Sequence, residues 1–396
     1  MPPLLLLALA LLADPAPVAL DALRPVGRPV WVDGGKRLAF PAKLDTAKAG
    51  AGERWYLLSA DGASATALTP EPLYESTEAV WWHPAGDRFA YVGDDKDRRT
   101  MFVWGVGDPE PTRFAVVGKL RRPVAAWAGD GSYLAFALAN APKADSPYDL
   151  FITAVNGANP SRVPMRLPPA AIAWSPDARR YAFLVQEQGV LRLFSCRRDL
   201  EIVAPLCPHL TAWPRSLSWS PDGSLLAFAG SADLNRGAKL YITTPSGLDL
   251  PVRLDRPGYL PDAPPVWSPD GRWLAWVAGP LSDPRRGRVW LAPTKAAASA
   301  KELVFGVGGG EPSFSTDGET LYFVRYDAWD PARGRLASVL TSDPGRLMIR
   351  DGDREAHTLV LSPDGARMAV VSGEAARAKL RVIALWPAPP GDVVNR

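Results

Sequence analysis

The apolar and polar positions of this chain follow one ten-residue pattern that recurs eight times. Each copy has an aromatic or apolar anchor, a polar tight-turn segment, and then a short apolar run centred on a small residue. The anchors are Trp31, Trp82, Trp127, Trp174, Trp219, Trp267, Phe314 and Leu361. Successive anchors are 51, 45, 47, 45, 48, 47 and 47 residues apart. The apolar runs lack the 3.6-residue periodicity of helices, so the pattern predicts repeated short strands.

A strand repeat with a period of 40–50 residues is typical of a β-propeller, in which each copy forms one four-stranded blade. We therefore predict an all-β fold, a single propeller of eight blades over residues 28–396, with a seven-bladed ring as the alternative. The last copy has three clear strands, and its fourth is a weak segment at 392–394. Alternatively, a strand near residues 18–23 closes the ring.

Each copy begins with a tight hairpin, which is clearest in "WSPDGSLLAF" at Trp219. Proline presets the first turn position, aspartate is accepted at the second, and glycine supplies the left-handed residue that follows. We expect the recurring aspartates of these turns to be structural: Asp130, Asp177, Asp222, Asp270, Asp317 and Asp364. A third strand such as "AKLYITT" from Ala238 and a fourth such as "LPVRL" from Leu250 complete the blade.

The apolar run after the turn has alanine at its centre in seven of the eight copies. Blades converge towards the axis of a propeller, so we expect a small side chain where neighbouring sheets approach most closely. The exception is Tyr322 in the seventh copy. The chain also has 15 tryptophans, and we expect most of them to pack between sheets, where each aromatic ring can bury roughly 150–250 Å².

The N-terminal segment "MPPLLLLALALLADPAPVA" contains a nine-residue apolar run followed by small residues and prolines. The run is too short to span a bilayer and is typical of a secretory signal peptide. We predict a signal peptide at residues 1–16 and a periplasmic or secreted protein, with residues 17–27 as a linker or closing strand. The alternative is a poorly ordered N-terminus on a cytoplasmic protein.

The formal net charge of +3 comes from interspersed acidic and basic residues, with no basic stripe, so nucleic acid is not an expected partner. After signal removal we expect no integral membrane segment. The two cysteines, Cys196 and Cys207, lie on adjacent strands with an offset too large for an ordinary disulfide. We favour two free, partly buried thiols, with a bridge as the alternative.

The "WSPDG" turn, the "LAF" run and the following "LYITTPSG" and "LPVRL" segments resemble the PD-type, WD-like repeat of the TolB propeller family. The resemblance covers all eight copies. It implies a propeller that binds partner proteins at the cell envelope, although the α/β domain that precedes the TolB propeller has no counterpart here. The same repeat forms the propeller of prolyl-oligopeptidase-like peptidases, whose G-x-S-x-G hydrolase motif is absent from this chain.

No catalytic or metal-binding motif is evident, so we predict no catalytic residues, no metal and no cofactor. The residues three or four before each anchor should open onto the mouth of the central channel. They share this face with the long loops between second and third strands, where binding concentrates. The candidate partner-binding residues on this face are Arg28, Glu78, Arg215, Glu311, Arg325, Tyr326, Trp329 and His357.

These features predict a monomeric, non-enzymatic protein that binds a protein or peptide partner. One alternative is a lyase or glycan hydrolase that uses Glu78 and Glu311 as acid and base. A second alternative is a propeller that is accessory to a separate hydrolase.

Overall fold

The computed structural model describes residues 18–44, 53–69, 80–95, 98–114, 124–139, 148–157, 161–165, 167, 169–198, 203–213, 216–232, 238–247, 249–254, 260–261, 264–279, 287–295, 301–302, 312–327, 330–349, 355–373, 378–385 and 392–394. The predicted signal peptide at 1–16 lies outside these ranges. Within them, no helix is long and apolar enough to cross a membrane.

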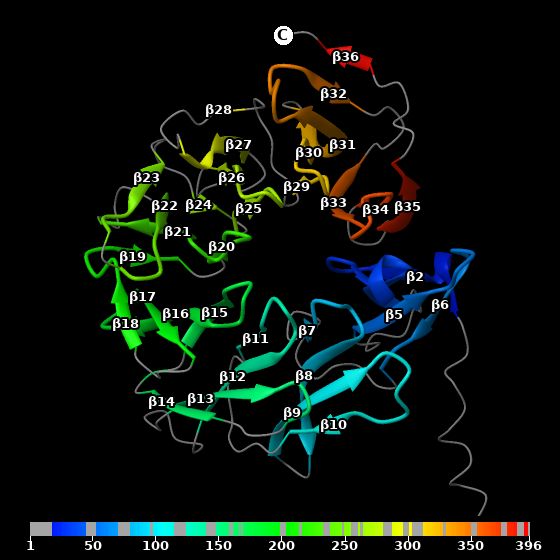
Figure 1. The fold of residues 1–396 in the computed structure, drawn as a ribbon. Helices are drawn as coiled ribbons and strands as arrows, with labels where there is room; N and C mark the ends of the chain where they lie inside the picture. Colours follow the sequence, from blue (N-terminus) through cyan, green and yellow to red (C-terminus); the bar gives the residue numbers. More distant parts are fainter. Residues whose placement is uncertain are drawn as a thin grey trace, which may run out of the picture.

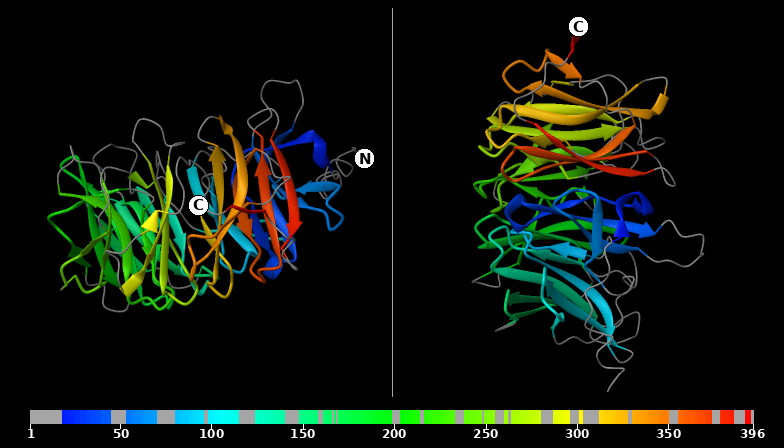
Figure 2. Two further views of the ribbon diagram at one scale, coloured as in Figure 1. Left: turned by 90° about the horizontal axis from the view of Figure 1, so that it is seen from above. Right: turned by 90° about the vertical axis from the view of Figure 1, so that its right-hand side faces the viewer.

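Eight antiparallel sheets surround a central axis, one for each copy of the repeat, and form an eight-bladed all-β propeller (Figure 1). The strands run roughly along the axis of the ring (Figure 2). The prediction of eight blades is confirmed, and the seven-bladed alternative is wrong. Two short 3-10 turns, η1 (Leu20–Ala22) and η2 (Asp33–Gly35), are the helical elements of the described residues.

Each of the first four blades contains four strands that follow one another from the inner to the outer edge of the blade. Blade 1 contains β3 (Val30–Val32), β4 (Arg37–Leu44), β5 (Arg54–Leu58) and β6 (Ser64–Ala67), with β2 (Leu23–Pro25) also pairing with β4. Blade 2 contains β7 (Val80–Trp82), β8 (Arg88–Asp95), β9 (Arg98–Gly105) and β10 (Thr112–Arg113). Blade 3 contains β11 (Ala125–Trp127), β12 (Tyr133–Ala139), β13 (Tyr148–Ala154) and β14 (Ser161–Met165). Blade 4 contains β15 (Pro169–Trp174), β16 (Arg180–Glu187), β17 (Val190–Arg197) and β18 (Val203–Leu206).

The second half of the ring continues this order, with divided inner strands in blades 5 and 6. Blade 5 contains β19 (Thr211–Ala212), β20 (Ser218–Trp219), β21 (Leu226–Ser231), β22 (Lys239–Thr243) and β23 (Val252–Leu254). Blade 6 contains β24 (Leu260–Pro261), β25 (Val266–Trp267), β26 (Trp273–Gly279), β27 (Arg288–Pro293) and β28 (Lys301–Glu302). Blade 7 contains β29 (Ser313–Phe314), β30 (Thr320–Asp327), β31 (Asp330–Leu340) and β32 (Leu347–Ile349). Blade 8 contains β33 (Ala356–Leu361), β34 (Arg367–Ser372) and β35 (Lys379–Ala384).

The two chain ends do not close the ring in either of the predicted ways. The C-terminal strand β36 (Asp392–Val394) pairs with β32 as a fifth strand of blade 7, so it is not the fourth strand of blade 8. The N-terminal strand β1 (Val18–Ala19) pairs with β6 of blade 1, so it does not close blade 8 either. Both segments instead extend the outer edges of the blades that flank blade 8.

The tight turn is built as the sequence predicts. In blade 5, the Ser220 hydroxyl donates to Asp222 Oδ1 (2.6 Å) and accepts from the backbone N–H of Leu225 (2.9 Å). The Gly223 N–H donates to the Ser220 carbonyl (2.9 Å), and Gly223 has a φ of 69°. Blade 4 has Ala178 at the corresponding position with a φ of 55°, a left-handed conformation that an alanine adopts only at a steric cost.

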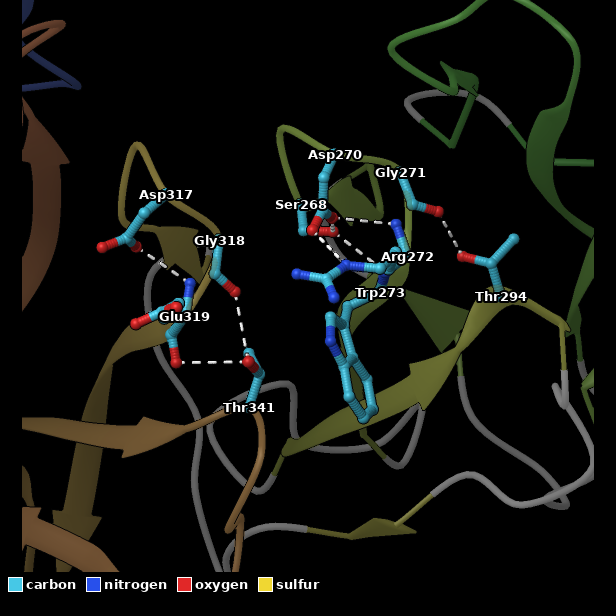
Figure 3. A network of polar contacts seen from close by, with 10 residues as sticks. All are labelled: Ser268, Asp270, Gly271, Arg272, Trp273, Thr294, Asp317, Gly318, Glu319 and Thr341. Atoms are coloured by element: carbon cyan, nitrogen blue, oxygen red, sulfur yellow. Dashed lines mark hydrogen bonds and ion pairs between the residues drawn. The ribbon is translucent and has the colours of Figure 1, made fainter.

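Figure 3 shows two of these turns and the polar side chains that connect them to the third strand. The Thr294 hydroxyl donates to the Gly271 carbonyl (2.7 Å), and the Thr341 hydroxyl donates to the Gly318 carbonyl (3.2 Å). Hydrogen bonding by Ser268 and by the Arg272 N–H opposes desolvation and lowers the pKa of Asp270. The turn aspartates are therefore structural in these blades, as predicted.

A buried apolar cluster fills each space between neighbouring blades, which we call a seam and number by its two blades. The seven predicted alanines are all 0% exposed, which confirms the close approach of the sheets at these positions: Ala39, Ala90, Ala135, Ala182, Ala227, Ala275 and Ala369. Tyr322 is half-buried and packs against the cluster of the 7–8 seam.

The anchor tryptophans also form a series of hydrogen bonds that the sequence analysis did not anticipate. In five of the six anchor tryptophans, the indole N–H donates to the backbone carbonyl that precedes the anchor of the previous blade; the indole N–H of the sixth, Trp82, is buried and has no hydrogen-bond partner among the described residues. The bonds are Trp31 to Val360 (3.0 Å), Trp127 to Trp81 (2.9 Å), Trp174 to Ala126 (3.1 Å), Trp219 to Ala173 (3.0 Å) and Trp267 to Ser218 (3.2 Å). These bonds join inner strands across five seams and fix the angle between the blades.

The two cysteines are free, as favoured from the sequence, and both are buried. Cys196 belongs to the cluster of the 3–4 seam, whereas Cys207 belongs to that of the 4–5 seam. The thiols therefore face opposite sides of blade 4, which explains the absence of a bridge. Burial raises the pKa of Cys207, although a hydrogen bond with Thr243 opposes the shift.

Candidate functional site

Three predicted residues come from two blades but lie at one end of the ring. Arg325 and Tyr326 lie near the end of β30, and His357 lies near the start of β33. An antiparallel ladder places the end of a second strand beside the start of an inner strand, so these residues share the channel-mouth end.

The strands that carry Tyr326 and His357 belong to two blades that approach each other tightly. Gly334 lies directly opposite Tyr326 in the β30–β31 ladder. A Cβ atom at Gly334 would be 1.8 Å from the Ala356 carbonyl oxygen, so glycine is needed for the strands to meet here. Tyr326 packs against the cluster that contains Ala356, the neighbour of His357. We call Arg325, Tyr326 and His357 the mouth cluster.

Two arginines lie opposite each other at the mouth cluster. Arg325 lies directly opposite Arg335 in the β30–β31 ladder, and both side chains are half-buried. The Nε atom of Arg325 is buried and has no hydrogen-bond partner among the described residues. His357 Nδ1 lies 3.0 Å from the Thr358 hydroxyl.

Arg28 lies in blade 1, between β2 and β3, at the same end of the ring as the mouth cluster. Its side chain is exposed, yet desolvation by surrounding protein lowers the pKa of its guanidinium. These two observations agree if the guanidinium stands in a concave, water-accessible opening, as expected at the mouth of a channel.

Four other predicted residues lie outside the described residues: Glu78, Arg215, Glu311 and Trp329. Among the described residues, no group of three or more His, Cys, Asp and Glu side chains could hold a metal ion.

A second candidate region, missed by the sequence analysis, lies in the 8–1 seam. The first and last blades are joined there by side chains, since neither terminal strand crosses between them. The Trp31 indole donates to Val360, and the Arg367 guanidinium donates to the Gly35 carbonyl. The Arg367 guanidinium also lies over the Trp31 ring, 4.9 Å from its centre, in a cation–π contact.

Two cavities open along this seam. One has a volume of about 430 Å³ and is lined by residues that include Trp31, Leu58, Arg367 and Val382. The other has a volume of about 550 Å³ and is lined by residues that include Leu20 and Leu380. The weak fourth strand of the last repeat was the one sequence signal that pointed to this region.

Comparisons with known proteins support the fold. No protein-family model matches the chain, and no curated protein matches its sequence. An oligogalacturonate lyase solved in complex with manganese superimposes with a TM-score of 0.57 at 14% identity, over 93% of this chain and 91% of that one. A prolyl endopeptidase gives a TM-score of 0.58 at 12% identity, over 90% of this chain but 55% of that one.

A putative TolB from Agrobacterium tumefaciens gives a TM-score of 0.42 at 19% identity, over 58% of this chain and 82% of that one. The chain is thus a β-propeller with distant structural similarity to TolB, lyase and peptidase propellers. At these identities the similarity concerns the fold, which hosts many unrelated functions.

Proposed function

We propose that this chain is an exported, TolB-like, monomeric propeller that binds a protein partner at the mouth cluster and catalyses no reaction. The observation that supports the proposal is that Arg325, Tyr326 and His357 come from two blades and lie at one end of the ring, beside the close approach of Gly334 to Ala356. A partly buried aromatic ring beside arginines is a common feature of protein-binding surfaces. The apolar cluster of the 7–8 seam beneath these residues would hold them in place.

Arg325 favours a partner surface that presents a carboxylate. The buried Nε atom of Arg325 has no hydrogen-bond partner among the described residues, and a carboxylate of the partner would accept a hydrogen bond from this guanidinium. Export is supported by the apolar leader at residues 1–16 and is tested by mass spectrometry of the protein from the envelope fraction. Cleavage after Ala13 or Ala16 is expected, and an intact N-terminus would contradict export.

The binding proposal is tested by affinity capture from envelope fractions with a Tyr326→Ala, His357→Ala double variant. A matched control is Leu250→Ala, because Leu250 is 87% exposed in the hairpin between third and fourth strands, at the opposite end of the ring. A specific partner should be lost with the double variant and retained with the control. Equal recovery of every protein with both variants would reject the mouth cluster as the binding surface.

A further inference from the structure

The seam between blades 1 and 2 lacks the indole hydrogen bond that the other tryptophan anchors form. The five acceptor carbonyls all belong to residues that lie opposite the central alanine of the second strand. In blade 1 the equivalent residue is Val30, which lies opposite Ala39 in the β3–β4 ladder. Trp82 therefore has an equivalent acceptor in Val30, yet its buried indole N–H has no hydrogen-bond partner among the described residues.

A wider seam does not explain the missing bond. The tight turn of blade 2 lies directly against β3 of blade 1, since a Cβ atom at Gly86 would be 2.6 Å from the Trp31 carbonyl oxygen. Val30 and Trp82 both pack against the cluster of the 1–2 seam. The donor and its equivalent acceptor thus belong to one packed region, and the Trp82 indole is turned away from the bond.

A second tryptophan accounts for the orientation of the Trp82 indole. Trp55 lies opposite Pro41 in the β4–β5 ladder, and Pro41 is two residues beyond the central alanine of its strand. Each of the five seams with an indole bond has methionine or leucine at the position of Trp55, in the same buried cluster as the bonded anchor. These residues are Met101, Leu150, Leu193, Leu240 and Leu380. The one aromatic side chain of this set therefore faces the one unbonded tryptophan anchor.

The two indoles meet in an edge-to-face contact. The ring centres of Trp55 and Trp82 are 5.2 Å apart, with an angle of 63° between the ring planes. The Phe89 ring also packs against Trp82, with its centre 4.9 Å away. Trp55 is 4% exposed, and its own indole N–H has no hydrogen-bond partner among the described residues. The contact thus gains aromatic packing but leaves two buried donors unpaired, and the cost of these donors opposes the gain.

We propose that Trp55 and Trp82 form an adjustable joint between blades 1 and 2. In the observed position, Trp82 packs against Trp55 and its N–H is unpaired. In the second position, Trp82 donates to the Val30 carbonyl, as the other five anchors do in their own seams. Each position gains one interaction and loses the other, so their free energies are similar, as a two-state element requires.

The consequence is a local change in the angle between two blades. The indole bonds fix this angle at five other seams, whereas at the 1–2 seam the angle follows the position of Trp82. The chain still connects the two blades in both positions, so the ring stays intact. The joint is separate from the mouth cluster, and either proposal can fail without the other.

The first measurement uses the whole protein with isotopically labelled tryptophan nitrogen, and a Trp82→Phe variant assigns the Trp82 indole resonance. Movement between the two positions should broaden this resonance on the microsecond-to-millisecond timescale, which relaxation dispersion detects. The five bonded indoles should show no such dispersion. A Trp82 indole that also shows none would overturn the joint.

Trp55→Leu gives blade 1 the residue that blades 3, 4, 5 and 8 have at this position. Dispersion should disappear, and the Trp82 indole N–H should exchange with solvent roughly tenfold more slowly, as expected for one added hydrogen bond. A crystal structure of the variant should show Trp82 Nε1 about 3 Å from the Val30 oxygen. The matched control is Trp104→Leu, because Trp104 is half-buried and packs against Phe89 instead of Trp82. Dispersion should persist in the control, and an unbonded Trp82 in Trp55→Leu would overturn the proposal.

The converse substitution, Leu240→Trp, places a second indole beside an anchor that is bonded. It should displace the Trp267 indole from the Ser218 carbonyl and accelerate its exchange roughly tenfold. A folded Leu240→Trp protein with an unchanged Trp267 bond would refute the role of the bulky side chain. If Leu240→Trp does not fold, Trp55→Leu decides the question. Trp55→Phe replaces Trp55→Leu if the latter does not fold, with the same direction of change expected.

Discussion

Strands β22 of blade 5 and β35 of blade 8 both begin in the sequence Ala-Lys-Leu, yet they have different surroundings. In blade 5, Tyr241 and Ile242 are 7% and 6% exposed and pair with β23. At the corresponding positions of blade 8, Arg381 is exposed and Val382 is 39% exposed, with no described strand beside them. The motif therefore determines a third strand and its pairing with the second, while the fourth strand depends on the chain beyond the repeat.

The same contrast separates the 8–1 seam from the other seams. Blades 4 and 5 are linked by the Trp219 indole bond and by continuous chain, whereas blades 8 and 1 are linked by the Trp31 indole bond and side-chain packing. The same indole hydrogen bond is therefore present at both seams. The difference is the covalent connection, which joins blades 4 and 5 but not blades 8 and 1. We expect the 8–1 seam to be the part of the ring that opens most readily.

A pair of proline substitutions gives the largest expected difference between the two strands. Ile242→Pro removes an N–H that faces β23 inside a four-stranded sheet and should destabilise the protein by about 3 kcal/mol or more. Val382→Pro affects the equivalent N–H at an edge that no described strand covers, and it should cost about 1 kcal/mol or less. Guanidinium denaturation of both variants measures the difference. Equal losses would show that the edge of β35 is covered.

Substitution of an anchor tryptophan, which removes its indole hydrogen bond, compares the stability of the two seams. Trp31→Phe and Trp219→Phe each leave a buried carbonyl without its donor, so each should lose about 1–3 kcal/mol of stability. Because blades 8 and 1 lack a covalent link, Trp31→Phe should also accelerate hydrogen exchange in blades 1 and 8 selectively. Exchange that rises equally around the ring in both variants would indicate that the seams are equivalent.

Substitution of the turn serine should have the same effect in both blades, since the tight hairpin is the same. The Ser220 hydroxyl is the largest cause of the lowered pKa of Asp222, and Ser362 has the same effect on Asp364. Ser220→Ala and Ser362→Ala should each cost about 1 kcal/mol at neutral pH. Denaturation from pH 7 to pH 2 measures both variants.

The pH dependence of this loss has a defined sign. A carboxyl group whose pKa is lowered by folding adds stability above its ordinary value of 3.8, and that stability is lost as the pH falls through the folded pKa. The difference between wild type and variant should therefore shrink below about pH 4. A difference that stays constant over this range would mean that the serine acts through its backbone contact alone.

The sequence was most informative where the determinants are local. The tight turn is specified by Ser220, Asp222 and Gly223, which contact each other within four positions, so its structure could be predicted residue by residue. The alanines at the closest approach of the blades could also be predicted, because wedge geometry requires a small residue in every copy. The number of blades follows directly from the number of repeats.

The functional regions were harder to predict because they combine residues from separate blades. The sequence predicted Tyr326 and His357 at the channel mouth, but the close approach of their blades at Gly334 and Ala356 is not revealed by any periodicity. The charge pair of Arg325 and Arg335 depends on the β30–β31 register. The indole bonds also escaped prediction, since packing alone accounts for a recurring tryptophan.

The sequence by itself determined an eight-bladed propeller, because each copy of the repeat carries the turn residues and the apolar run that form its own inner strands. The tertiary structure alone decided where the two chain ends pair, because a short strand of two or three residues binds whichever sheet edge lies within its reach. Only the folded ring therefore shows that both ends extend the blades that flank blade 8.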